Sequence, residues 1–170
     1  MNLSTSCLSE DAVSRHGCTL YRSPVGEVNV IEEMEKRGAA IGGEGNGGVI
    51  HEECHLGRDS AVAMAYAVSY LRDNPETTLA DWADSYPSYI NMKKKVDFNG
   101  SFECLSALLT DSMGKPHDTR DGLWWKREGG WLHIRPSGTE PVVRFIAENT
   151  SRIILEGDYE VFRKVLTCVE

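Results

Sequence analysis

The run Arg-Pro-Ser-Gly-Thr-Glu-Pro at positions 135–141 gathers the residue types that bind phosphate. A phosphate site needs hydroxyl donors, free backbone N–H groups and a guanidinium group. Ser137 and Thr139 supply hydroxyls, and Gly138 lets the backbone turn so that N–H groups can converge. The arginine that opens the run ends one predicted strand, and Arg144 lies just inside the next, so both are expected to face this loop. The alternative is a hairpin loop whose polar side chains only cap turns, and a short motif does not decide between the two.

A second loop, Gly42 to Gly48, contains five glycines in seven residues. Because glycine has no side chain, a ligand can approach the backbone of such a loop closely. Glu44 and Asn46 carry its only side chains, and a carboxylate and an amide spaced by one residue can grip adjacent hydroxyls of a sugar. The loop lacks the Lys-Ser/Thr of a nucleotide-binding P-loop, and Glu44 would repel phosphate. The alternative interpretation is a flexible glycine connection without a ligand.

Three further groups are weaker candidates for chemistry. His51, Cys54 and His55 could belong to a zinc site, but the sequence offers no evident fourth ligand. His133 shares a strand face with positions 131 and 135, so it could contact a ligand or pack as an ordinary strand residue. The basic run Lys93–Lys95 is interpreted as a solvent-exposed strand, although it could present a cation to a substrate.

The first half of the chain alternates predicted helices and short strands, which indicates an α/β layer. A glycine at position 38 ends one periodic segment, and Thr78 with Asp81 resembles a capping box. Apolar residues over 59–73 form two stripes, which predicts a helix buried on most sides. The predicted elements are a short helix capped by Ser9, a strand over 18–22, a helix over 27–36 with Val28, Ile31 and Met34 on one face, strands over 39–41 and from 49, and helices over 59–73 and from 78.

From about residue 87 the pattern changes to successive strands flanked by helices, which indicates a small α+β domain. A hairpin turn is predicted at 128–130, and Trp124, Trp125 and Trp131 are expected in the sheet core. The predicted elements are a linker strand over 89–98, a helix opened by Ser101 and closed by Gly114, strands over 122–126, 131–135 and 142–148, and a last helix capped by Asp158. The sequence is therefore divided into an α/β domain over 1–88 and a domain with a mainly antiparallel sheet over 89–170.

The composition argues against several classes of partner. With 18 Lys and Arg against 26 Asp and Glu, the formal net charge is −8, which disfavours nucleic acid and anionic membranes. No apolar run is long enough to span a membrane, and the first residues do not resemble a secretory signal. Five scattered cysteines favour free thiols in a reducing environment. We therefore expect a cytoplasmic protein.

The two loops, in this order and about ninety residues apart, resemble those of the α-D-phosphohexomutases. This family includes phosphoglucomutase, phosphomannomutase and phosphoglucosamine mutase. The glycine loop ends in Asn-Gly-Gly where many members have Ser-Gly-His, and in this it resembles the glycine-rich variant of the archaeal-type phosphoglucosamine mutases and some bacterial relatives. Further segments that resemble the family, in the same order, are 2–6, 23–28, Gly57-Arg-Asp59, Tyr86-Pro-Ser-Tyr89 and Asp121-Gly122.

The resemblance implies that the chain holds most of the family's third domain, followed by its fourth. It also implies two groups of substrate-binding residues. The residues that would contact sugar hydroxyls are Glu44 and Asn46. The residues that would bind the phosphate that is not transferred are Arg135, Ser137, Gly138 and Thr139, with Arg144 in support.

The family's reaction is the reversible transfer of a phosphoryl group between the 1- and 6-oxygens of a hexose phosphate. Its phosphoserine loop and its Mg²⁺ loop of alternating aspartates have no counterpart in this sequence. The chain alone is therefore expected to hold no metal and no catalytic residue, and to be inactive. Its expected partners are a hexose phosphate and the N-terminal domains of the same protein. The alternative is a stand-alone, non-catalytic module that binds a sugar phosphate or a partner protein.

Overall fold

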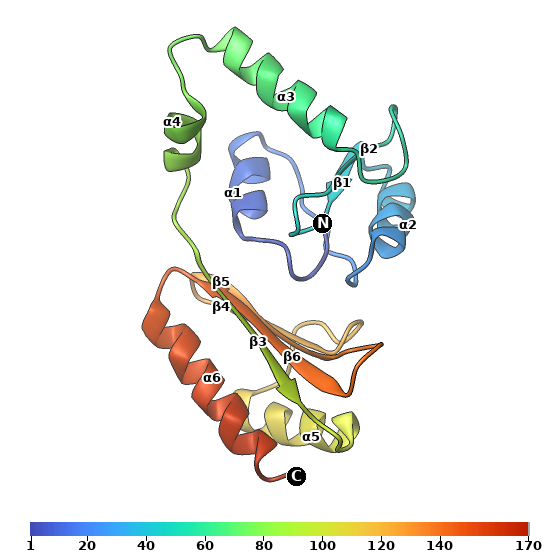
Figure 1. Ribbon diagram of the computed structural model, residues 1–170, viewed down its shortest axis with the longest axis vertical. Coiled ribbons are helices and arrows are strands. Elements are labelled where there is room, and N and C mark those ends of the chain that lie inside the picture. Colours follow the sequence, from blue (N-terminus) through green and yellow to red (C-terminus); the bar gives the residue numbers. More distant parts are fainter. Residues whose placement is uncertain (170) are drawn as a thin grey trace. The chain divides into compact units, whose positions relative to one another are not determined.

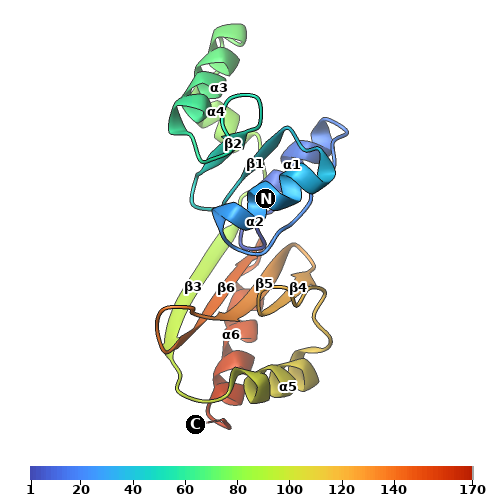
Figure 2. The same cartoon turned by 90° about the vertical axis from the view of Figure 1, so that its right-hand side faces the viewer.

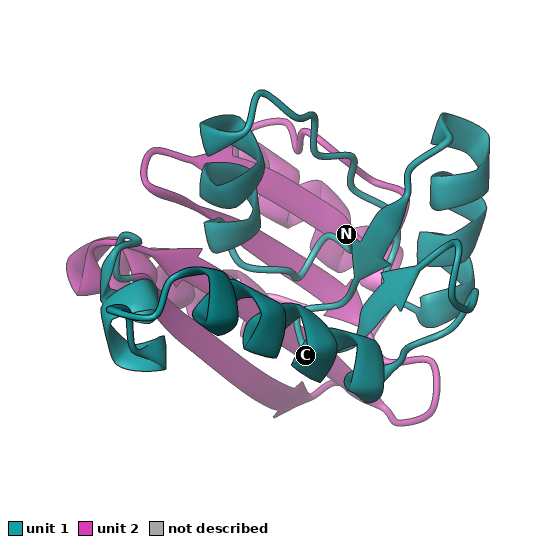
Figure 3. Ribbon diagram, turned by 90° about the horizontal axis from the view of Figure 1, so that it is seen from above, with its two compact units in different colours: residues 1–88 teal, residues 89–170 magenta. Residues whose placement is uncertain are grey.

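The computed structural model describes residues 1–169 and divides the chain into two compact units. Unit 1 covers Met1–Ser88, and unit 2 begins at Tyr89. Figure 3 colours the two units separately. Each unit has a sheet and a hydrophobic core of its own.

Unit 1 consists of a two-stranded antiparallel hairpin and four helices, of which α2 and α3 lie next to the hairpin (Figure 1). The hairpin pairs Ile41 with His51 and Gly43 with Val49, so the glycine loop is the connection between its strands. An isolated parallel bridge joins Asn2 to Ser23. The elements in chain order are α1 (Leu8–Arg15), α2 (Glu27–Arg37), β1 (Ile41–Gly43), β2 (Val49–His51), α3 (Ser60–Asp73) and α4 (Leu79–Asp84).

Some helix ends of unit 1 follow from local capping chemistry. Gly38 ends α2 in the left-handed conformation with φ of 62°, as predicted. The capping box of Thr78 and Asp81 opens α4, which confirms that prediction. The predicted cap at Ser9 is wrong, because α1 begins one residue earlier and the Ser6 hydroxyl accepts a hydrogen bond from the Leu8 N–H at 3.1 Å.

The core of unit 1 is small and centres on Val30, Met34 and Ile50. Val28 is exposed, so the predicted apolar face of Val28, Ile31 and Met34 is not the buried face of α2. The buried face instead follows the i, i+4 spacing of Val30 and Met34, with Ile31 packed beside them. The strand predicted over 18–22 does not form. The nearby residues Met1 and Leu3 bond the backbone of Ser23, and the Met1 amino group donates to the Tyr21 carbonyl, which makes an isolated bridge and no ladder.

Helix α3 differs most from its prediction. None of its residues is buried, and Met64 and Val68 are 61% and 65% exposed. Within unit 1 its main neighbouring element is β2, and Tyr66 meets the His51 ring edge-on at 5.7 Å. The two apolar stripes of this helix therefore exceed the surface that unit 1 offers to cover them.

Unit 2 is a four-stranded antiparallel sheet with two helices, in the strand order β3-β6-β5-β4 (Figures 1 and 2). The first strand therefore pairs with the last strand. This arrangement confirms the predicted α+β character and the mainly antiparallel sheet. The elements in chain order are β3 (Ile90–Asp97), α5 (Phe102–Met113), β4 (Leu123–Arg127), β5 (Gly130–Pro136), β6 (Val142–Asn149) and α6 (Arg152–Leu166).

Both helices of unit 2 contribute to the core on one face of the sheet. Strand alternation places Leu132, Ile134, Val143 and Phe145 on this face, and they pack with buried residues of α5 and α6. Arg135 and Arg144 are paired with each other between these positions, so they point to the opposite face of the sheet. The three tryptophans at 124, 125 and 131 are buried, as predicted.

In unit 2 the predicted hairpin turn is confirmed, whereas the predicted start of the last helix is wrong. The hairpin turn between β4 and β5 contains Gly129 at φ of 70°, as expected. Gly130 is required because a side chain there would collide with the Glu148 carbonyl. The predicted cap at Asp158 is wrong, because α6 already begins at Arg152, and Asp158 instead pairs with Arg127 at 3.1 Å. No helix within residues 1–169 has the length and apolar character needed to cross a membrane.

Candidate functional site

The loop at 137–141 connects β5 to β6 and is held at its base by the backbone. The Ser137 N–H donates to the Val142 carbonyl at 2.9 Å, and the Val142 N–H donates to the Glu140 carbonyl at 2.8 Å. The Phe98 N–H donates to the Pro141 carbonyl at 2.9 Å, which ties the loop to the end of β3. The tip of the loop is therefore an exposed bend on a fixed base.

Several donors at the tip of this loop have no protein partner within residues 1–169. They are the hydroxyls of Ser137 and Thr139 and the N–H groups of Gly138 and Thr139. Gly138 does not adopt a left-handed φ, so the prediction that its freedom is needed for the turn is wrong. A Cβ at Gly138 would meet no atom within 4 Å, so glycine leaves open space beside these donors. Hydroxyl and amide donors gathered around open space suit an anion.

Arg135 and Arg144 stand directly opposite each other on β5 and β6. Residues paired in this way point to the same face of a sheet. Arg135 contacts the carboxylate of Asp121 through Nη1, at 3.1 Å to Oδ1 and 3.3 Å to Oδ2. Arg144 Nη2 lies 3.6 Å from Glu140 Oε2. The Nε atoms of both arginines are buried and have no hydrogen-bond partner, so each guanidinium keeps donor capacity that its carboxylate does not use.

Asp121 is a residue of this site that the sequence analysis did not assign. It precedes Gly122, which has φ of 79° and no room for a side chain beside Ile134 and Arg135. The close approach at Gly122 brings the Asp121 carboxylate against the Arg135 guanidinium. The Asp121-Gly122 pair is one of the segments that resemble the family, but a single acidic residue before glycine does not indicate that Arg135 is its partner.

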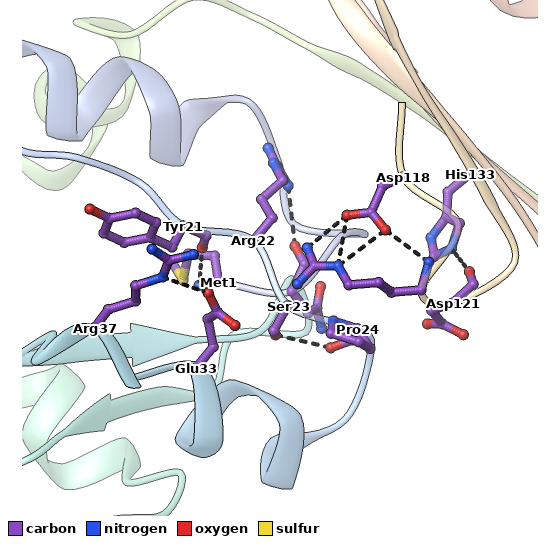
Figure 4. Close-up of polar contacts among 12 residues, drawn as sticks. Met1, Tyr21, Arg22, Ser23, Pro24, Glu33, Arg37, Asp118, Asp121 and His133 are labelled. Carbon is purple, nitrogen blue, oxygen red and sulfur yellow. Dashed lines mark hydrogen bonds and ion pairs between the residues drawn. The ribbon is translucent and has the colours of Figure 1, made fainter. Parts of the chain in front are cut away.

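His133 anchors the backbone of Asp121 (Figure 4). Its Nε2 lies 2.5 Å from the Asp121 carbonyl, which can only accept, so Nε2 carries the proton. Burial lowers the pKa of His133, an effect that the nearby carboxylates of Asp121 and Asp118 oppose and the Arg135 charge reinforces. His133 is fully buried and supports the site as a packed strand residue, which was the second of the two roles considered for it.

Lys95 is a third basic residue near the loop at 137–141. Its Nζ lies 2.7 Å from Glu140 Oε1, and this hydrogen bond lowers the pKa of the Glu140 carboxyl, with the Lys95 and Arg144 charges adding to the effect. The cations that face the loop are therefore each paired with an acidic side chain of unit 2.

In unit 1, the Glu44 carboxylate is turned inward. Its side chain is 7% exposed, and Oε1 accepts hydrogen bonds from Asn2 Nδ2 at 2.9 Å and from the Gly26 N–H at 3.2 Å. Oε2 faces Arg58 Nη1 at 3.5 Å. Glu44 therefore ties the glycine loop to the first residues of the chain and to the start of α2, besides any role toward a ligand.

Asn46 is exposed at the tip of the glycine loop. Its Oδ1 accepts from the Gly48 N–H at 3.3 Å, and within residues 1–169 its amide nitrogen has no protein partner. The glycines on either side are needed mainly for packing. A Cβ at Gly45 would lie 2.7 Å from the Ser4 carbonyl oxygen, and one at Gly48 would collide with the Arg58 side chain. Much of the space left by these glycines is therefore filled by protein.

The histidine and cysteine cluster does not form a metal site. His51 Nδ1 lies 3.1 Å from Cys54 Sγ, while a Cβ at Gly57 would lie 2.6 Å from His55 Nε2, so the second histidine turns toward Gly57. No three His, Cys, Asp or Glu side chains within residues 1–169 are arranged to hold a metal ion.

Comparison with known families identifies both units. Residues 1–89 match the family described as phosphoglucomutase/phosphomannomutase, alpha/beta/alpha domain III. Residues 93–157 match the C-terminal domain of the same family.

Similar proteins point to the same family. A phosphoglucomutase/phosphomannomutase of Thermococcus kodakarensis is 33% identical over 152 residues, covering 88% of this chain and 33% of that protein. A phosphoglucosamine mutase of Methanococcus maripaludis is 33% identical over 144 residues, covering 82% of this chain and 32% of that protein. This chain thus spans about a third of the length of these relatives.

Solved structures agree on the fold. A phosphoglucomutase/phosphomannomutase family protein of Burkholderia thailandensis superposes with a TM-score of 0.76 at 21% identity, over 98% of this chain and 36% of that one. A protein of Thermus thermophilus titled putative phosphomannomutase superposes with a TM-score of 0.69 at 22% identity, over 98% of this chain and 35% of that one. The chain therefore belongs to the phosphoglucomutase/phosphomannomutase family, with domain III in residues 1–89 and the C-terminal domain in residues 93–157.

Proposed function

We propose that this chain is the substrate-recognition part of a phosphohexomutase and binds a hexose phosphate through two loops. The loop at 137–139 would hold the phosphate that is not transferred, with Arg135 and Arg144 beside it. The observation that carries the proposal is the set of unpartnered hydroxyl and amide donors at the tip of this loop, next to two guanidinium groups. In a chain with a net charge of −8, this is a local concentration of anion-binding groups.

Binding of phosphate at this loop has a clear physical basis. Phosphate accepts several charge-assisted hydrogen bonds at once, and arginine offers planar donors that match its oxygens. Hydroxyl and backbone donors would bind the phosphate group without contacting the sugar attached to it. Such a loop would accept the substrate in either orientation, which a reaction that moves phosphate between the 1- and 6-oxygens requires.

Asn46 and Glu44 in the glycine loop would form hydrogen bonds with hydroxyl groups of the sugar. The exposed amide nitrogen of Asn46 can donate to a hydroxyl oxygen. The Glu44 carboxylate has about four lone-pair positions, so Oε2 keeps acceptor capacity after Oε1 has bonded Asn2 and Gly26. The role of Glu44 toward the sugar would thus be combined with its structural role.

The parent enzyme would catalyse reversible 1-/6-phosphoryl transfer, with N-terminal domains of the same protein as partners. The relatives named above are phosphoglucomutase/phosphomannomutase and phosphoglucosamine mutase proteins, which fits an isomerase of this class. Mg²⁺ bound elsewhere in the parent would stabilise charge on the phosphoryl group that moves. The contribution of this chain would be to bind and orient the substrate.

Calorimetric titration with hexose 1-phosphates and 6-phosphates tests the proposal. The double variant Ser137→Ala, Thr139→Ala removes two hydroxyl donors, each contributing about 0.5–1.5 kcal/mol, so both ligands should bind about fivefold to a hundredfold more weakly. Ser112→Ala is the matched control, because the Ser112 hydroxyl bonds only the Leu108 carbonyl of its own helix. Unchanged affinity in the double variant, or an equal loss in the control, would contradict the proposed site.

A further inference from the structure

Three basic residues form a line across neighbouring strands of unit 2. In the sheet register Lys95 on β3 is opposite Arg144 on β6, and Arg144 is opposite Arg135 on β5. Paired residues share a face, so all three side chains point away from α5 and α6. The preceding residue, Lys94, points to the other face of the sheet. It is paired with the core residue Phe145 and places its Nζ over the Tyr159 ring of α6. Lys95 therefore belongs to the same face as the two arginines of the phosphate site.

Glu140 connects this line to the phosphate loop. One carboxylate oxygen lies 2.7 Å from Lys95 Nζ, and the other lies 3.6 Å from Arg144 Nη2. Glu140 lies two residues after Gly138, at the end of the same exposed bend. A single carboxylate thus contacts two cations that stand next to the unpartnered donors of the loop.

We propose that Lys95 is a further phosphate-binding residue, and that Glu140 is an internal counter-ion that phosphate displaces from Lys95 and Arg144. This inference rests on the proposed function, because it adds a third cation to the same phosphate site. It replaces the sequence-based interpretation of Lys95 as a merely solvent-exposed strand residue. Lys93, on the same face but two pairs farther along β6, is opposite Ile146 and lies outside this group.

The exchange of one anion for another is physically favourable here. Lys95 and Glu140 are 53% and 42% exposed, and such a surface ion pair is held only weakly against solvent and salt. Phosphate offers more negative charge than a carboxylate and more acceptor oxygens, and it also gains the loop donors at Ser137 to Thr139. A rotation of the Glu140 side chain releases both cations without moving the sheet, because the backbone bonds at the loop base do not involve that side chain.

The lysine run supplies its own controls for the test. Inorganic phosphate would be titrated into the full 170-residue chain and its Lys95→Gln, Lys94→Gln and Lys93→Gln variants, following backbone amide shifts by NMR. Each variant removes one positive charge from the same strand, so general changes in net charge are matched. One charged contact at an exposed site is expected to change affinity by about threefold to tenfold. Lys95→Gln should show this loss, and the other two variants should bind like the parent.

Glu140→Gln separates direct contact from simple neutralisation. Removing the competing carboxylate should tighten phosphate binding. If Lys95 contacts phosphate, Lys95→Gln will still weaken binding in the Glu140→Gln background. If Lys95 serves only to neutralise Glu140, the effect of Lys95→Gln will vanish there, and the inference is overturned.

The remaining outcomes distinguish this inference from the proposed function. A parent chain that binds phosphate at Ser137 to Thr139, with Lys95→Gln indistinguishable from Lys94→Gln, would overturn the inference and leave the phosphate site intact. A parent chain in which phosphate shifts no amide of that loop would overturn both.

Discussion

Replacement of Asp121 by asparagine should both destabilise unit 2 and increase its stabilisation by phosphate. Within residues 1–169 Asp121 is the side chain that pairs with Arg135, through Nη1 contacts of 3.1 and 3.3 Å, and the two side chains are 18% and 21% exposed. Asparagine keeps the shape and one acceptor but removes the charge. The Arg135 guanidinium is then left partly buried without a counter-ion, and its Nε has no partner in either case.

The expected magnitudes follow from the character of this contact. Asparagine can still accept a hydrogen bond from the charged guanidinium, so the loss is the charge–charge attraction of a partly buried pair, and Asp121→Asn should cost about 1–2 kcal/mol in the free energy of unfolding. Two anions on one guanidinium lie about 5 Å apart and repel by about 0.8 kcal/mol per unit charge even in water. Removing one of them should tighten phosphate binding about fivefold, which adds about 1 kcal/mol of stability at saturating phosphate.

Urea denaturation followed by tryptophan fluorescence measures both effects. Trp124, Trp125 and Trp131 all lie in unit 2, so a Trp82→Phe background makes the signal specific to that unit. Asp118→Asn is the control, because Asp118 lies in the same loop but bonds Arg120 and not Arg135. An Asp121→Asn variant as stable as its parent, or one that phosphate stabilises no more than the Asp118→Asn control, would refute this role of Asp121.

Three further predictions concern individual side chains. Arg135→Ala should weaken phosphate binding by about ten- to a hundredfold, because one charged donor contributes about 1.5–3 kcal/mol, and equilibrium titration with phosphate would check this. Glu44→Gln should weaken hexose phosphate binding while leaving inorganic phosphate affinity unchanged, since Glu44 is assigned to hydroxyls only; an equal loss for both ligands in calorimetry would refute that role. Burial lowers the pKa of His133, so the unfolded state binds its proton more readily and the contribution to stability is lost as pH falls from about 6.5 through the folded pKa. Unfolding curves from pH 8 to 5 should therefore show a steeper loss for the parent than for His133→Gln, and parallel curves would contradict the assignment.

Much of unit 2 could be predicted from sequence because its signals are local. Ser101 caps α5, Gly114 ends it, and the alternation along β5 and β6 identifies the face that packs against the helices. Asp158 misled the prediction because an acidic residue before apolar ones resembles a helix cap, whereas here it is the mid-helix partner of Arg127.

Unit 1 was harder to predict because burial and strand pairing depend on neighbours that periodicity does not reveal. The segment at 18–22 has the composition of a strand, but within the described chain no strand lies beside it to complete a ladder. Helix α3 has a strongly apolar pattern, yet Met64 and Val68 remain exposed for want of a covering element in unit 1. A hydrophobic pattern indicates that a surface can be buried and does not identify what buries it.

At the site, the sequence indicated the groups that could bind phosphate and missed those that hold them. Two arginines near one loop could be inferred from adjacent strands. The carboxylates that neutralise them, Asp121 and Glu140, depend on a close approach at Gly122 and on the loop geometry, and neither is encoded as a spacing. The inward turn of Glu44 toward Asn2 also lies beyond sequence reasoning, because the two residues are 42 positions apart.

The most direct test of phosphate recognition is an amide-resolved NMR titration of the chain with inorganic phosphate. The N–H groups of Gly138 and Thr139 have no protein acceptor within residues 1–169, so they are available to bond an anion. Their resonances should shift most and saturate together with those of Ser137, while resonances of the hairpin turn at Gly129 at the other end of β5 stay unchanged. Silent amides at Gly138 and Thr139, with phosphate-dependent shifts concentrated elsewhere, would show that the loop is a structural turn and would contradict the account.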